Sequence, residues 1–592
     1  MALQRLYSLP RSHIILLNIR TYCASFRDLC WVSKWGRYLH RTLREIPPKQ
    51  IIYKRLIRFL PTAVASLASF DEASRTSPGI QSPVPPDTTS PSSKDLFMDH
   101  PHISSAEDDA RLEALGVKSD FDRSMSMLEN FALGFTYLSP VVGVYTLFDS
   151  SLQTGGSPMI WSYVIAGLGQ FLVALIFGEV VSQFPISGGI YPWARRLVGR
   201  KWSWVTAWVY VWALFTTIAA VATGAAPFLA LLTGAPSTPF ITTAIALALI
   251  IFSTACNLAG TKLLARVAMF GFVCELVGAL FVGGYLLMFH RVNSLGSLLD
   301  PMNAAPVNGS YLPAFLAASL LGLFSCYGFE ACGDVAEEIP NPGRQIPKAM
   351  RMTIYIGVGA SIFACAALLL AVPNIPAVIS GETPNALSDV LLNAFGSTGT
   401  KGVAAIVMVS FMSCVLSLQA AVSRLIYSFS RDRMIPGAKA LSRISPHSHV
   451  PTTALFVAGL VPSAIAVLGF FAADALTTIV SFAVVGIYVA FQMVVAGALY
   501  ARFRGWQPSG DFTLGRWGTA INIAALIYGV LAIINILWPR TPDAPWYINY
   551  SMLIGLVVVV VSALVYLAVG RPHLRGTTGY ADAWLISPRK SR

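Results

Sequence analysis

Apolar runs of about 20 residues recur between residues 128 and 570, and they constrain the fold of this chain more than any other feature. A helix of that length crosses the ~30 Å hydrocarbon core of a bilayer. The composition agrees, because 55% of the 592 residues are hydrophobic and only 12% are charged, against about 25% charged in soluble domains. We therefore expect an all-α polytopic membrane protein.

The apolar runs predict twelve transmembrane helices. Their expected bounds are 128–150, 159–184, 204–232, 239–259, 266–289, 312–336, 351–373, 401–429, 450–471, 474–500, 518–538 and 548–570.

Basic residues alternate from one short linker to the next. Every second linker is rich in them: Arg195, Arg196, Arg200, Lys201, Lys262, Arg266, Arg344, Lys348, Arg351, Arg431, Arg433, Lys439, Arg443, Arg502, Arg504 and Arg516. The other linkers hold only Arg291, Lys401 and Arg540. By the positive-inside rule, the first set and both termini face the cytoplasm. We expect an integral protein of the plasma membrane.

A glycosylation sequon gives a modest check of this orientation. Asn308, Gly309 and Ser310 form it, and they lie in the 290–311 linker, which the topology places outside the cell. Asn308 is therefore a candidate glycosylation site.

The first 97 residues differ from the remainder. Residues 1–70 are Arg-rich, with only Asp28 and Glu45 as acids, and they carry most of the net charge of +13. Residues 71–97 are rich in Ser, Pro and Thr and are typical of a disordered linker. The extension fits an organelle transit sequence, a basic arm on the inner leaflet, or a start codon assigned too far upstream. We favour the last interpretation.

Cytoplasmic tails are expected at residues 98–127, which Met98 opens, and at residues 571–592. Because the basic block lies in the extension, the remainder of the chain gives no indication of nucleic-acid binding. Six of the eight cysteines fall within the predicted spans without metal-ligand spacing, so we expect no metal and no cofactor: Cys256, Cys274, Cys326, Cys332, Cys365 and Cys414.

The first predicted span is interrupted in its middle. Residues 131–149 read FALGFTYLSPVVGVYTLFD, and Pro140 removes a backbone donor between Gly134 and Gly143. This pattern predicts either a simple proline kink or an unwound segment whose free N–H groups meet an anion.

The sixth span is interrupted as well. In residues 327–350, YGFEACGDVAEEIPNPGRQIPKAM, two glycines (Gly328 and Gly333) and two acids (Glu330 and Asp334) fall inside an apolar segment. Such residues are costly at membrane depth unless they line a protein cavity. Breaks in spans one and six indicate a five-plus-five inverted repeat with a substrate site at the breaks.

Three motifs give the chain a family resemblance. Residues 178–193, GEVVSQFPISGGIYPW, resemble an acid…FP-x-SGG-x-Y-x-W signature, and residues 337–349, EEIPNPGRQIPKA, resemble EE-x-x-NP-x-R-x-x-P-x-A. Residues 257–262, NLAGTK, are also similar to the family. Over residues 125–570 the chain resembles the amino acid–polyamine–organocation permeases, and within them the fungal amino acid/choline transporters with their GABA permease-like members.

The resemblance implies a LeuT-like fold with discontinuous helices 1 and 6. Residues 128–500 would form a ten-helix transport core, and residues 501–570 would form two peripheral helices.

A substrate carboxylate is expected at the span-one break, where helix N-terminal N–H groups point inward. The residues implied there are Thr136, Ser139, Pro140, Val141 and Val142, with packing through small residues as the alternative. On span six the resemblance implies Phe324, Cys326, Tyr327, Gly328 and Phe329. The rings of Phe324 and Tyr327 could attract an ammonium group, or could simply pack in the core.

Buried acids are candidates for carrying a coupling proton. Glu330 follows the span-six break, and the aligned acid in related bacterial antiporters is associated with pH sensing and gating. Glu275 lies mid-way along span five with no base nearby in sequence, although a neutral, hydrogen-bonded acid is an equal alternative. Ser413 and Ser417 on span eight suit a coupling ion or helix packing. We expect H⁺ as the coupling ion, mainly from the resemblance.

An inner gate is expected where span six meets the cytoplasm. Glu337, Glu338 and Arg344 lie at this mouth, and their opposite charges could form a gate that opens with each cycle. A solvated charge run is the alternative.

These features predict a proton-coupled importer of an amino acid or small amine, not an enzyme. A channel would need a recurring polar stripe, which the spans lack, and an enzyme would need clustered His, Asp or Cys. A non-transporting nutrient sensor, or a choline or polyamine transporter, stays open. GABA and α-amino acids are favoured because they carry the carboxylate that the span-one break would hold.

Overall fold

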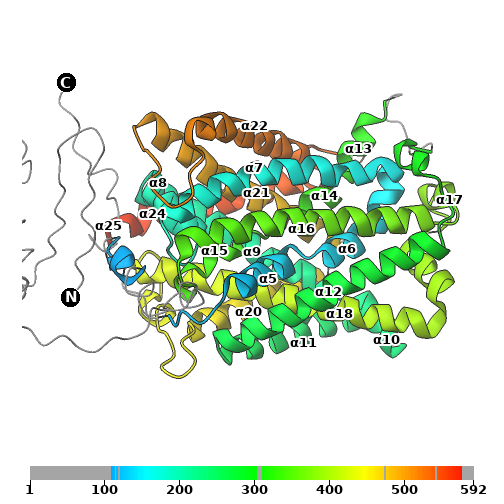
Figure 1. Cartoon of the computed structure of the whole chain (residues 1–592), viewed down its shortest axis with the longest axis horizontal. Coiled ribbons are helices and arrows are strands. Elements are labelled where there is room, and N and C mark those ends of the chain that lie inside the picture. Colours follow the sequence, from blue (N-terminus) through cyan, green and yellow to red (C-terminus); the bar gives the residue numbers. More distant parts are fainter. Residues whose placement is uncertain are drawn as a thin grey trace, which may run out of the picture. The chain divides into compact units, whose positions relative to one another are not determined.

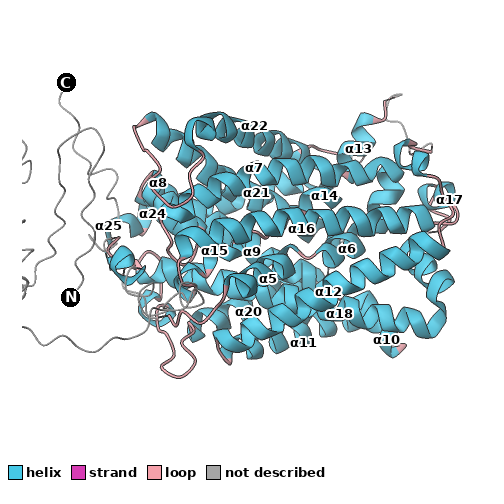
Figure 2. Ribbon diagram, viewed as in Figure 1, coloured by secondary structure: helices cyan, strands magenta, loops and turns pink. Residues whose placement is uncertain are grey.

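The computed structural model describes residues 108–113, 115–117, 121–236, 238–302, 304, 310–383, 385–471, 475–540, 543 and 545–575. These residues form helices joined by loops (Figure 2). Three predicted features lie outside the described part of the chain. They are the extension over residues 1–97, the candidate glycosylation site at Asn308, and residues 576–592 of the C-terminal tail.

Within the described residues, eleven helical segments are long and apolar enough to span a membrane. Most correspond to single predicted spans: α11 (Pro239–Leu258), α12 (Thr261–Phe289), α16 (Pro342–Ala371), α18 (Ala386–Arg431), α20 (Thr452–Gly469), α21 (Ala475–Phe503), α22 (Gly518–Leu537, with η6, Gly515–Trp517, before it) and α24 (Ser551–Val569). Three consist of consecutive helices: α5 (Met127–Leu138) with α6 (Pro140–Gly155), η3 (Ser157–Ile160) with α7 (Trp161–Gln183), and α9 (Arg200–Gly224) with α10 (Ala226–Thr233).

The sixth predicted span is missing from this set because it is divided into short pieces. They are α13 (Leu312–Ala318), α14 (Leu320–Ser325), α15 (Ala331–Asp334) and η5 (Ala336–Glu338). The remaining described elements are α8 (Ile190–Leu197), η4 (Leu295–Leu299), α17 (Ile375–Ile379), α19 (Ala438–Leu441), α23 (Trp546–Asn549) and α25 (Pro572–Arg575).

Two helices, α16 and α18, begin at least nine residues before the bounds that the apolar pattern predicted. α16 starts at Pro342 rather than at residue 351, because a proline at the first helical position needs no N–H partner and has a helical φ. α18 includes residues 386–400 ahead of the predicted span, and Gly396, with φ 63° and ψ −179°, separates this part from the remainder.

The helix α5 begins at a capping box and ends in the middle of the bundle. Ser126 and Glu129 exchange side-chain-to-backbone hydrogen bonds at its first turn. Figure 1 shows α5 and α6 end to end, with α16 on one side and α12 on the other. Because α18 also packs against α5 and α6, the junction between the two helices is enclosed by protein.

The bundle has two distinct ends. α8 and α25 lie at one end, and α10, α13 and α17 lie at the other (Figure 1). Arg195 and Arg196 of α8 and Arg431 at the close of α18 belong to the first end, which we call the basic end.

Candidate functional site

The first helix break is built around Ser139. This residue has a left-handed backbone, with φ 44° and ψ 88°, and it ends α5 and caps α6 at once. Pro140 takes the first position of α6, so the next free donors are the N–H groups of Val141 and Val142. The Val142 N–H donates to Ser139 Oγ at 3.3 Å.

A buried glutamate from α12 occupies this break. Glu275 Oε1 accepts the hydroxyl of Ser139 at 2.5 Å and the N–H of Val141 at 2.9 Å. Glu275 is 0% exposed, and its Oε2 has no hydrogen-bond partner. The break was predicted to hold a substrate carboxylate; in this structure a carboxylate of the protein lies there.

The second break lies against the first. α14 ends at Ser325 and α15 begins at Ala331, and Gly328 between them has φ +115°. A Cβ on Gly328 would come within 2.5 Å of Leu138 N, so only glycine permits this approach between the two breaks.

The free N–H at this second break is also bonded to a carboxylate. Gly328 N–H donates to Glu330 Oε2 at 2.8 Å, and the hydroxyl of Tyr210 on α9 donates to Oε1 at 3.2 Å. Glu330 is 0% exposed. Each break therefore pairs a backbone donor with an internal glutamate.

The predicted aromatic residues divide into two groups. The ring of Tyr327 lies 6.0 Å from that of Phe324 and 6.3 Å from that of Tyr137, centroid to centroid, so these three rings meet at the breaks. Phe329 instead packs against Phe177 of α7 and Phe491 of α21.

Cys326 also faces away from these rings, because its thiol contacts the carbonyl of Tyr163 on α7 at 3.9 Å. All the predicted substrate residues are buried.

The predicted hydroxyl residues gather beside the first break. Thr136 Oγ1 lies 2.8 Å from Ser417 Oγ. Ser413 donates to the carbonyl of Ser410 at 3.0 Å and packs against Gly271, one helical turn before Glu275 on α12. Thr136, Ser413, Ser417 and Glu275 thus form one neighbourhood, whereas Glu330 belongs to the second break.

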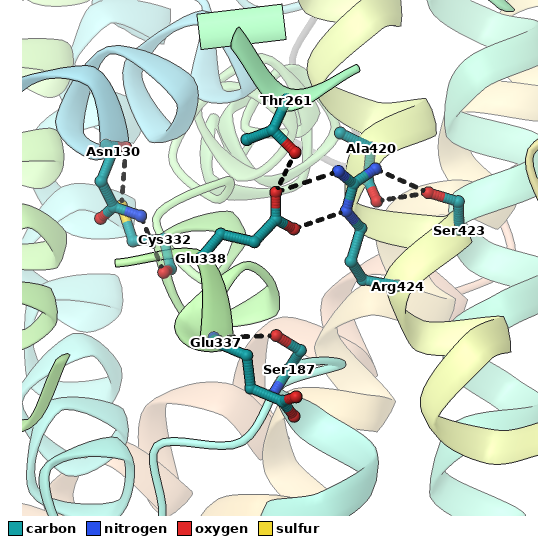
Figure 3. Close-up of polar contacts among 9 residues, drawn as sticks. All are labelled: Asn130, Ser187, Thr261, Cys332, Glu337, Glu338, Ala420, Ser423 and Arg424. Carbon is teal, nitrogen blue, oxygen red and sulfur yellow. Dashed lines mark hydrogen bonds and ion pairs between the residues drawn. The ribbon is translucent and has the colours of Figure 1, made fainter. Parts of the chain in front are cut away.

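Two ion pairs hold Glu337 and Glu338 at the basic end. The guanidinium of Arg424 donates to Glu338 Oε1 at 2.9 Å and to Oε2 at 3.2 Å, and the Thr261 hydroxyl adds a 2.6 Å bond (Figure 3). Arg424 and Glu338 are both 0% exposed.

Glu337 is held in a similar way, by Arg431 Nη1 at 3.0 and 3.2 Å and by the Ser187 N–H at 3.1 Å. The N–H of Glu337 donates in turn to Ser187 Oγ, as Figure 3 shows.

The predicted gate acids are therefore paired, but with other bases than the one proposed. Arg344 is exposed, and the described contacts include no ion pair to it. The bases are Arg424 and Arg431 of α18, which the sequence interpretation missed. Arg424 could have been found, because it is a lone charge within an apolar span and such charges usually have partners.

The two signature motifs meet at the basic end. Gly188 N–H donates to the carbonyl of Asp334 at 2.9 Å, and a Cβ on Gly189 would lie 2.5 Å from Asp334 Oδ1. The Asp334 carboxylate is 0% exposed, and neither oxygen has a hydrogen-bond partner. Asp334 is a third buried acid near the breaks, and its unpaired state could not be read from the sequence.

A hydrogen bond from Tyr191 joins α8 to Asp432, the residue that follows α18. Burial raises the pKa of Tyr191, so its hydroxyl keeps its proton and donates to Asp432 at 2.6 Å. Arg195 also pairs with Asp432.

A segment of the predicted N-terminal tail reaches the same end. Asp108 Oδ2 accepts the N–H of Asn341 at 2.8 Å, next to the start of α16. Burial raises the pKa of Asp108. Further along, the N–H of Met125 donates to the carbonyl of Glu338 at 3.1 Å, so the tail contacts η5 directly.

Comparisons with known proteins agree with this architecture. The family model described as amino acid permease matches residues 126–560. A second model, described as haem-dependent oxidative N-demethylase, alpha subunit-like, matches residues 1–64, which lie outside the described residues. The chain is also similar in fold to a manganese transporter of Eremococcus coleocola, with a TM-score of 0.52 at 15% identity, covering 77% of this chain and 99% of that one.

Curated relatives match over most of their length. The amino-acid permease BAT1 homolog of Oryza sativa subsp. japonica is 26% identical over 491 residues, covering 77% of this chain and 92% of the relative. A putative amino acid/polyamine transporter of Macrophomina phaseolina is 26% identical over 419 residues, covering 68% and 92%. The family is one of transporters, not of enzymes. Since the family model covers more than half of the sequence, this chain belongs to the amino acid permease family.

Proposed function

We propose that this permease is a secondary active transporter that imports an amino acid or small amine together with a proton, by alternating access. One observation carries the proposal: two broken helices meet in the middle of the bundle, and each break holds a buried glutamate. Broken helices at mid-membrane are how secondary transporters form substrate and ion sites.

Glu275 and Glu330 are the proposed proton carriers. Among the described residues neither has an ion-pair partner, and a buried carboxylate without one is costly while ionised. Binding a proton removes that cost, and releasing it requires a path to water. Ser413, which packs against α12, and Ser417, which contacts Thr136, would line the proton site. When the basic end opens, Glu337 and Glu338 would separate from the arginines of α18.

The substrate is proposed from the family and from the rings at the breaks. Phe324, Tyr327 and Tyr137 present aromatic faces that suit an ammonium group. GABA-like and α-amino acids are the candidates that the resemblance favours, and one relative is named for both amino acids and polyamines. Choline and polyamines form the alternative. The same proposal has four further parts. They are membership of the fungal amino acid/choline branch, a five-plus-five repeat, a plasma-membrane location and a basic end that faces the cytoplasm.

Uptake into proteoliposomes under an imposed pH gradient tests this function. We expect one or more of labelled GABA, choline, putrescine and α-amino acids to accumulate above equilibrium, and a protonophore to abolish the accumulation. A facilitator would only equilibrate its substrate, and a sensor would bind without uptake.

The coupling assignment is tested by Glu275→Gln and Glu330→Gln in the same assay, with the exposed Glu382→Gln as the matched control. If both core variants keep the pH dependence of the wild-type protein, these glutamates do not carry the proton.

A further inference from the structure

The free backbone donors at both helix breaks are already bonded to carboxylates of this protein. Glu275 Oε1 accepts from Ser139 and Val141, and Glu330 Oε2 accepts from Gly328. A substrate carboxylate would need these same donors, because a helix N-terminus attracts anions through its unpaired N–H groups.

Glu275 is well placed to hold its position. Its carboxylate reaches the N-terminus of the 16-residue helix α6 from α12, and it combines a backbone donor with a hydroxyl donor on one oxygen. Charge-assisted bonds of this kind are roughly twice as strong as neutral ones. A substrate carboxylate would have to displace it and leave Glu275 buried without partners.

The second oxygen of the same carboxylate is free. Glu275 Oε2 is buried and has no hydrogen-bond partner, so the group has one saturated and one open side. An ionised buried carboxylate requires a compensating cation or proton. A substrate ammonium fits that requirement.

The charge balance of the core points the same way. Three buried acids, Glu275, Glu330 and Asp334, lack an ion-pair partner in the part of the chain that the structure describes. Arg424 and Arg431 of α18 are already paired, with Glu338 and Glu337. The surroundings of the breaks are acidic and aromatic, which suits a cation better than a zwitterion.

We propose that Glu275 is a built-in substitute for a substrate carboxylate, so that this permease selects amines that carry no carboxylate. This inference rests on the proposed transport function, and it decides between the two substrate classes that the function leaves open. Glu275 then excludes amino acids by filling their anion site, and it attracts the amine through Oε2. The ammonium takes the place of a proton on Oε2, so on this inference Glu330 is left to carry the proton that moves with the amine.

Matched ligand pairs that differ by one carboxylate give the sharpest test. Putrescine is compared with ornithine, cadaverine with lysine, and choline with betaine, by equilibrium binding to the purified full-length protein in nanodiscs. We expect the member without a carboxylate to bind at least about tenfold more tightly in at least one pair, a difference of about 1.4 kcal/mol. Equal or tighter binding of the carboxylated member in every pair would overturn the inference.

Two variants separate the charge of Glu275 from its occupancy of the break. Glu275→Gln keeps an oxygen for Ser139 and Val141 but removes the charge, so amine affinity should fall at least tenfold without a gain for the amino acid. Glu275→Ala empties the break, so amine affinity should fall and the carboxylated partner should bind more tightly than to the wild type. Glu382→Gln, at an exposed site, should change neither.

The possible outcomes distinguish the inference from the function. Preference for amino acids in the wild type, or an unchanged preference in both Glu275 variants, overturns the inference and leaves transport intact. If Glu275→Ala does not fold, the wild-type pairs and Glu275→Gln still decide. Absence of binding and uptake for every probe overturns the proposed function itself.

Discussion

At the residue scale, the candidate site depends on two residues with a positive φ, a backbone conformation that most L-amino acids rarely adopt. Ser139 has φ 44° and Gly328 has φ +115°, and each interrupts a helix at the same depth of the bundle. Ser139 is non-glycine in the left-handed region, which is uncommon and is often associated with function. Its hydroxyl donates to Glu275 and caps α6, and these two hydrogen bonds offset the cost of the backbone conformation.

Replacing Gly328 with alanine should weaken the contact between the breaks. The new Cβ would lie 2.5 Å from Leu138 N at a positive φ, so we expect a loss of about 1–3 kcal/mol in stability. Thermal unfolding in detergent measures the stability, and uptake should fall with it. Gly359→Ala is the matched control, because no atom lies within 4 Å of a Cβ there. Equal melting temperatures for the two variants would show that the break tolerates a side chain.

The sequence singled out the buried acids but not the groups that they contact. Glu275 and Glu330 could be named as candidates because acids in apolar spans are rare, and their functional role stays a prediction. Their bonding partners, Ser139 and Val141 in one case and Tyr210 in the other, lie more than 100 positions away in sequence. A single sequence contains no information on such pairings, so the filling of the break by Glu275 was not foreseen.

At the element scale, α18 supplies both cations that pair with the predicted gate acids. Arg424 and Arg431 lie two helical turns apart on it, and they reach Glu338 and Glu337 on the last turn of the broken span. The sequence predicted that these acids would pair with bases at this end, and their role as a gate stays a prediction. It misplaced the base, because Arg344 is near the acids in sequence whereas Arg424 is near them in space.

Arg424→Gln should therefore destabilise the protein much more than Arg344→Gln. Removing Arg424 leaves Glu338 buried with its charge uncompensated, which typically costs about 3–5 kcal/mol. Arg344 is exposed, and its replacement should change stability by less than about 0.5 kcal/mol. Adding Glu338→Gln to Arg424→Gln should recover much of the loss. Similar melting temperatures for the two single variants would argue against α18 as the partner of the gate acids.

Asp108 gives a pH-dependent prediction for the segment that contacts α16. Burial raises the pKa of Asp108 in the folded protein, so its stabilising contribution is present at pH values below its usual range near 3.8 and is lost as pH rises through the raised value. Asp108→Asn keeps an oxygen for the Asn341 N–H but cannot ionise. We expect the variant to gain stability relative to wild type as pH rises above about 4. Thermal melts from pH 4 to 7 measure this, with the exposed Asp122→Asn as control.

At the scale of the whole molecule, polar contacts join distant segments at both ends of the described bundle. At the basic end, ion pairs join Glu337 and Glu338 to α18, and at the opposite end Tyr311 donates to the carbonyl of Gly155 at 2.6 Å. Asn293 links the same end to Val372 at 2.7 Å. The membrane class and the broken spans followed from hydropathy and from glycines and prolines. The contacts at the two ends did not, because they join residues that are far apart in sequence.

Weakening the gate should expose Cys332, which lies in α15 just above it. In this structure the thiol is buried and contacts Asn130 and Thr353. With the other seven cysteines replaced, the combination Glu337→Gln and Glu338→Gln should shift the protein toward opening at the basic end, since an alternating-access protein responds to the relative stability of its states. A thiol reagent added from that side should then label Cys332 at least about tenfold faster than in the protein with an intact gate.

Cys365, retained alone in the same gate variant, is the control: it is buried in α16 towards the opposite end, and its labelling rate should not change. Faster labelling at both positions would indicate general loosening rather than a gate, and unchanged labelling at Cys332 would show that the ion pairs do not hold the basic end shut.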